Sequence, residues 1–141
     1  MTRTTVIPRI IASALLMALV LASLPMSSVV AKGTTESLEN KWDQLVSNYN
    51  TQSTNHSSVH KWVDHWLLTN KSASDKAEVL KHLRICNSAI LAAGAIVSKH
   101  SGFDAEGKVV DRSAALKSIK DLGFFLRQHA GSVKNLSEHI N

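Results

Sequence analysis

The chain has 141 residues, 44% of them hydrophobic, and a formal net charge of +5 from 16 Lys and Arg against 11 Asp and Glu. This length excludes a multidomain enzyme and a long repeat array. The single cysteine excludes an intramolecular disulfide framework and a zinc finger built on Cys pairs. Both prolines and all three methionines lie at or before position 26, which indicates that the N-terminal segment and the remainder are unlike parts.

Residues 1–31 carry the features of a secretory signal. Arg3 and Arg9 form a positively charged start, and the apolar segment Ile10–Leu24 follows. A proline and a run of small residues then lead to a cleavage site after Ala31. The apolar segment is shorter than the ~20 residues that span a bilayer. We therefore expect a cleaved signal peptide and export to the periplasm or out of the cell, with a retained N-terminal anchor as the alternative.

The remainder, residues 32–141, contains no proline and shows helical periodicity, which predicts one all-α domain. Four helices are expected, at about 35–49, 57–68, 74–99 and from 113 onward. The polar run 50–55 predicts a loop between the first two, and Gly131 is a place where the last helix could break. The apolar stretch 89–97 is too short to cross a membrane and predicts a core helix. Short connections favour a compact antiparallel bundle of about four helices.

Three residues that can bind metal ions, His56, His60 and Asp64, follow one another at steps of four. On a helix this spacing places them along one face, and two histidines at i and i+4 can chelate zinc or copper. They are the candidate metal ligands. The competing interpretation is a solvated polar face opposite the tryptophans. The seven histidines also raise the prospect of pH-dependent binding, because each titrates near pH 6.5 unless perturbed.

Catalytic signatures do not occur in this sequence. It lacks Gly-x-Ser-x-Gly, a phosphate loop, a dinucleotide fingerprint and His-Glu-x-x-His. Cys86 falls on the apolar seam of the third expected helix, which predicts a buried thiol. The Gly-containing stretch 101–111 does not fit an EF-hand loop, and residues 32–141 offer no methionine as a haem ligand. We expect neither enzymatic activity nor a cofactor.

Basic residues outnumber acidic ones in the second half, but the two kinds are interleaved. A nucleic-acid-binding protein would concentrate its charge more strongly. Attraction to an acidic partner protein or to an anionic membrane surface is the more natural use of this charge. Because aromatic side chains often anchor interfaces, Trp62, Trp66 and Phe124 are the candidate partner-binding residues.

Together these features predict a small exported helical module that binds another protein sterically. Immunity proteins, inhibitors and periplasmic chaperones belong to this physical class. Two alternatives stay open: a metal- or haem-binding bundle that uses the histidines, and a secreted membrane-active toxin or effector.

Overall fold

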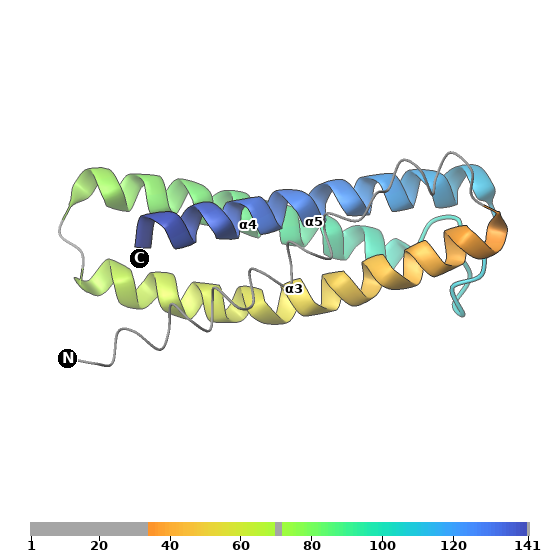
Figure 1. Cartoon of the computed structure of the whole chain (residues 1–141), viewed down its shortest axis with the longest axis horizontal. Coiled ribbons are helices and arrows are strands. Elements are labelled where there is room, and N and C mark those ends of the chain that lie inside the picture. Colours follow the sequence, from red (N-terminus) through yellow and green to blue (C-terminus); the bar gives the residue numbers. More distant parts are fainter. Residues whose placement is uncertain (1–33, 70–71, 141) are drawn as a thin grey trace.

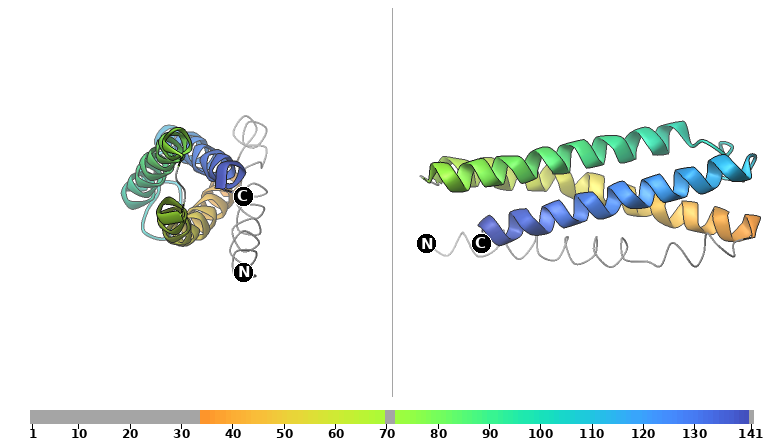
Figure 2. Two further views of the ribbon diagram at one scale, coloured as in Figure 1. Left: turned by 90° about the vertical axis from the view of Figure 1, so that its left-hand side faces the viewer. Right: turned by 90° about the horizontal axis from the view of Figure 1, so that it is seen from above.

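The computed structural model describes residues 34–69 and 72–140. This part of the chain forms three long helices, α3 (Thr35–Thr69), α4 (Ala73–Lys99) and α5 (Arg112–Ile140). They pack side by side into an elongated bundle in which α4 runs antiparallel to the other two (Figures 1 and 2). The all-α prediction is thus confirmed. The expected signal peptide lies outside the described residues.

The prediction of four helices is wrong at the polar run 50–55, because α3 continues through it without a break. Two threonines turn their hydroxyl groups back onto the helix: Thr51 Oγ1 donates to Ser47 O (3.2 Å) and Thr54 Oγ1 donates to Asn50 O (2.9 Å). Gln52 is buried, with 1% of its surface exposed. The run contains neither proline nor glycine, so nothing in it breaks the helix.

Both limits of α4 and the start of α5 agree with expectation to within a residue. The Ser72 hydroxyl accepts a hydrogen bond from Asp75 N and caps the start of α4. The helix ends at Lys99 and is capped by His100, whose φ of 37° is left-handed. Gly131 does not break α5. The apolar stretch 89–97 is too short to cross a membrane, but α4 as a whole is long and apolar enough to do so. The core helix of a soluble protein can have the same length and composition. Here α4 packs on both other helices.

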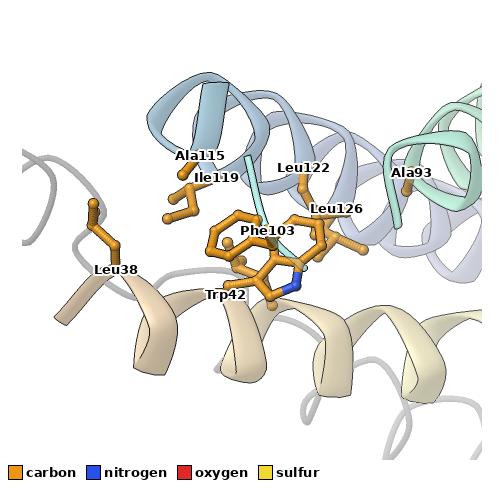
Figure 3. Packing of buried hydrophobic residues seen from close by; sticks show 9 residues of the cluster. Leu38, Trp42, Ala93, Phe103, Ala115, Ile119, Leu122 and Leu126 are labelled. Carbon is orange, nitrogen blue, oxygen red and sulfur yellow. The ribbon is translucent and has the colours of Figure 1, made fainter. Parts of the chain in front are cut away.

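The connection between α4 and α5 is held by its own backbone and by α3. Asp104 Oδ1 accepts from Glu106 N and Lys108 N (3.0 and 2.9 Å), and Val109 N donates to Glu39 Oε2 of α3 (2.8 Å). Phe103 is 3% exposed and stacks on Trp42, with ring centroids 4.5 Å apart (Figure 3). The connection therefore contributes to the core.

Most of the buried apolar residues belong to two clusters at opposite ends of the bundle. The cluster at the α4–α5 connection is built around Trp42, Phe103 and Leu122 (Figure 3). The second lies toward the end of α3 and the start of α4 and is built around Val63, Leu83 and Leu136. Between them the helices bury polar side chains instead, and this layer is the most unusual feature of the core.

Candidate functional site

A network of histidine and amide side chains occupies the layer between the two apolar clusters. Each helix contributes: His56 and His60 lie on α3, Asn87 on α4 and His129 on α5. His56 Nδ1 is 3.0 Å from His129 Nε2, and His56 Nε2 is 2.8 Å from Asn87 Oδ1. His60 Nε2 approaches the same Asn87 oxygen at 2.7 Å. The Asn87 amide of α4 thus joins the His56 and His60 rings of α3, and His56 also contacts His129 of α5.

The network extends along α3 through two buried amides. His129 Nδ1 lies 2.7 Å from Gln52 Oε1, and Gln52 Nε2 donates to Asn48 Oδ1 at 3.0 Å. Both amides are 1% exposed. Asn48 Nδ2 is buried and has no hydrogen-bond partner, and such an orphaned donor is costly in a protein interior. A rearrangement that gives Asn48 Nδ2 a hydrogen-bond partner is therefore favourable.

The direction of the hydrogen bonds determines where the protons lie. With Gln52 Nε2 donating to Asn48, the Gln52 oxygen accepts from His129 Nδ1. At the other end, His56 Nε2 faces the Asn87 oxygen and donates to it. The bond between His56 Nδ1 and His129 Nε2 then needs one more proton, so that either His56 or His129 is an imidazolium.

Turning the Asn48 and Gln52 amides by 180° reverses the direction and removes the charge. Gln52 Nε2 then donates to His129 Nδ1, and His129 Nε2 donates to His56 Nδ1, so that both rings are neutral. Asn48 Nδ2 gains the Gln52 oxygen as its partner. The network can hence exist with or without one extra proton while the hydrogen bonds that join its members are kept.

Burial favours the neutral form. His129 is 2% exposed, and its removal from water, together with the nearby His56, lowers its pKa to about 4. The pKa of His56 is also lowered, mainly by burial and further by His60, although the bond to Asn87 opposes this. At neutral pH the reversed, uncharged direction is therefore expected.

A basic face with one exposed aromatic residue lies on the outside of α5. We use the term basic face for Lys117, Lys120, Phe124, Arg127 and Lys134, which are all exposed and recur at helical spacing. Phe124 is 53% exposed. Its ring meets that of Phe125 edge-on, with centroids 5.1 Å apart, which holds it against the helix. The positive charge of Arg127 also acts on Lys41 of α3. The pKa of Lys41 is lowered, mainly by burial and further by repulsion from Arg127.

Of the expected aromatic anchors, only Phe124 is fully on the surface. Trp62 is 6% exposed and belongs to the core, so its proposed role as a surface anchor is not supported. Trp62 shares its side of α3 with Val59 and Val63, which are buried as well. Trp66 is half-buried against the second apolar cluster.

The expected metal stripe is also rearranged. His56 and His60 do lie together, with ring centroids 4.8 Å apart, but both face Asn87 whereas Asp64 is exposed. Each step of four residues advances ~40° around an α-helix, so two steps carry Asp64 away from His56 toward solvent. The third member of the cluster is instead His129, which is 73 positions from His56 along the chain.

Cys86 is completely buried, as predicted. Burial raises the pKa of its thiol to about 12, and a hydrogen bond with Ser132 opposes this only in part. A thiol held in this protonated form is not a nucleophile at neutral pH.

No protein-family model matches the chain, and neither a curated protein nor a solved structure is similar to it. The arguments about function consequently rest on the geometry and charge of the described residues.

Proposed function

We propose that this protein is an exported, non-catalytic binding module that recognises an acidic protein surface through the basic face of α5. The observation that carries the proposal is Phe124, an aromatic side chain more than half exposed between Lys120 and Arg127. Burying so large an apolar group at an interface is favourable, and aromatic residues are enriched among interface hot spots.

The surrounding charge suits an acidic partner. The sequence of α5 holds five Lys and Arg against two acidic residues. One of the two acids, Asp121, is paired with Lys117. Lys120, Arg127 and Lys134 leave a positive field around Phe124, and such a field accelerates association with a negatively charged surface and disfavours basic ones.

A protein partner fits this face better than a lipid surface does. An interfacial membrane helix needs a broad apolar face turned outward. The apolar face of α5 packs inward, where Ile119, Leu122 and Leu126 belong to the core. One exposed aromatic side chain within a charged surface is typical of an anchor for a pocket on a partner.

The mechanism is steric. Three helices joined by two apolar clusters and a hydrogen-bonded polar layer form a stiff body, and binding loses little conformational entropy when the binding face is already ordered. Such a body blocks whatever function the covered surface of the partner performs. This is how an inhibitor or immunity protein acts, and a periplasmic chaperone shields a partner's surface in a similar way.

Site-specific photo-crosslinking in the cells that produce the protein tests this proposal. A photoreactive phenylalanine analogue at position 124 is expected to capture one predominant acidic protein. Leu91 supplies the matched control, because it is an exposed apolar residue (72%) on an uncharged part of α4. The same analogue at position 91 is expected to capture much less of that protein.

Charge reversal then tests the recognition chemistry. With the captured protein purified, the Lys120→Glu/Arg127→Glu variant is expected to bind it at least ~10-fold more weakly, mainly through slower association, and high salt is expected to reduce wild-type binding. Equal capture at positions 124 and 91, or unchanged affinity after charge reversal, would refute the proposal. Leakage of anionic vesicles caused by the purified protein and lost in the variant would replace it with the membrane-active alternative.

A further inference from the structure

A second group of histidines lies at the end of the bundle where α5 terminates beside the first turns of α4 (Figure 1). Glu78 and His82 are one turn apart on α4, and His139 is the penultimate residue of α5. Each of the three offers one ligand atom, and these atoms all lie within 4.8 Å of one another. In the chain as described, residues 34–69 and 72–140, this is the group of three that could share a metal ion.

His82 is the most firmly held member of this group. Its side chain is 15% exposed, and its Nε2 lies 3.8 Å from Glu78 Oε2. Its other ring nitrogen, Nδ1, is buried without a hydrogen-bond partner. The ring of His139 lies over it, with centroids 5.4 Å apart and planes inclined by 31°. A largely buried ring whose Nε2 faces a carboxylate, next to a second imidazole, resembles an incomplete coordination shell.

We propose that Glu78, His82 and His139 bind a divalent transition-metal ion of the zinc class. Two imidazoles and one carboxylate form a donor set that zinc accepts, and a water molecule would complete a tetrahedral shell. Nitrogen and carboxylate donors in this combination favour zinc over calcium or magnesium, which prefer oxygen donors alone.

The geometry requires only side-chain movement. Zinc holds nitrogen and oxygen ligands at ~2.0–2.2 Å, so tetrahedral ligands lie ~3.3 Å apart, closer together than the 3.8 Å that separates His82 Nε2 from Glu78 Oε2. Glu78 is about half exposed at 49%, and His139 is exposed. Both can therefore rotate toward the more restricted His82.

The consequence of binding is to fasten the C-terminal turn of α5 to α4. Helix ends fray because their last carbonyl groups lack partners within the helix. A metal bridge between residues 82 and 139 would hold that end in place and stabilise the adjoining apolar cluster, to which Leu83 and Leu136 belong. This site is separate from the buried network of His56, His60 and His129, and it does not depend on the partner proposed for α5.

Zinc titration of the purified, metal-stripped protein tests the site. Competition with a chromophoric chelator measures the affinity, and thermal unfolding measures the stabilisation. At zinc about a hundredfold above its Kd, the melting temperature is expected to rise by roughly 10 °C. His139→Ala is expected to weaken zinc binding at least ~10-fold, and this exposed substitution leaves the core untouched. Glu78→Gln is expected to weaken it in the same direction.

Two controls make the result decisive. His65→Ala removes an exposed histidine of α3 outside this group and is expected to leave zinc affinity unchanged. Cobalt(II) substitution is expected to give the ligand-field absorption of a tetrahedral site, and His139→Ala is expected to abolish it. Zinc binding that is insensitive to His139→Ala but lost in His60→Ala would assign the metal to the buried network and overturn the proposal. Absence of thermal stabilisation by zinc would overturn it as well.

Discussion

Acidification is expected to destabilise the fold through the buried network. The size of the loss in the free energy of unfolding follows from the pKa of His129. Its pKa is about 4 in the folded protein and near 6.5 in an unfolded chain. Between these values the unfolded state binds a proton that the folded state does not, so the free energy of unfolding falls as the pH falls. Each pH unit across the window is worth up to ~1.36 kcal/mol, and the complete loss is ~3.4 kcal/mol.

At pH 5.0 the expected loss relative to pH 7.5 is ~2 kcal/mol from His129 alone. The lowered pKa of His56 acts with the same sign. For a domain of this size the loss corresponds to a fall in melting temperature of roughly 10 °C. Urea unfolding followed by circular dichroism at the two pH values measures it directly.

Variants separate this network from general acid effects. His129→Gln removes the group that carries most of the pH dependence and is expected to cut the loss by more than half. His65→Gln, at an exposed position of α3, is expected to keep the full loss. If His129→Gln does not fold, NMR titration of the wild-type imidazole protons gives the answer: His129 is expected to stay neutral down to about pH 5. A wild-type protein equally stable at both pH values, or a His129 that titrates near pH 6.5, would refute the reasoning.

Other predictions concern the backbone and the thiol. Gly131 lies within α5, and a Cβ there would meet no atom within 4 Å, so Gly131→Ala is expected to stabilise the protein by ~0.5–1 kcal/mol in urea unfolding. Gly102→Ala is expected to destabilise it by more than this, because Gly102 has a φ of +91° and a Cβ there would lie 2.1 Å from Ala115 N; equal effects of the two substitutions would contradict both. Cys86 is expected to react with a thiol reagent at least ~100-fold faster in denaturant than in the native state, since its pKa is about 12 and its side chain is buried; rapid native labelling would show that the core opens there.

The sequence by itself determined the fold class and most of the helix limits. The absence of proline from residues 32–141 and the apolar period of 3.6 residues predict both limits of α4 and the start of α5 almost to the residue, because these features act within one helix. The burial of Cys86 and the exposure of Phe124 follow from the same local periodicity.

Only the tertiary structure decided what the polar residues do. Gln52 looks like a loop residue because its partner His129 lies on another helix, far along the chain. Phe103 lies in the Gly-containing stretch between two expected helices, and only the structure shows that Trp42 stacks on it. The meeting of His82 with His139 likewise depends on where α5 ends beside α4. The position of a polar or aromatic side chain depends on the group that it hydrogen-bonds or stacks with. In each of these cases that group lies on a different segment of the chain.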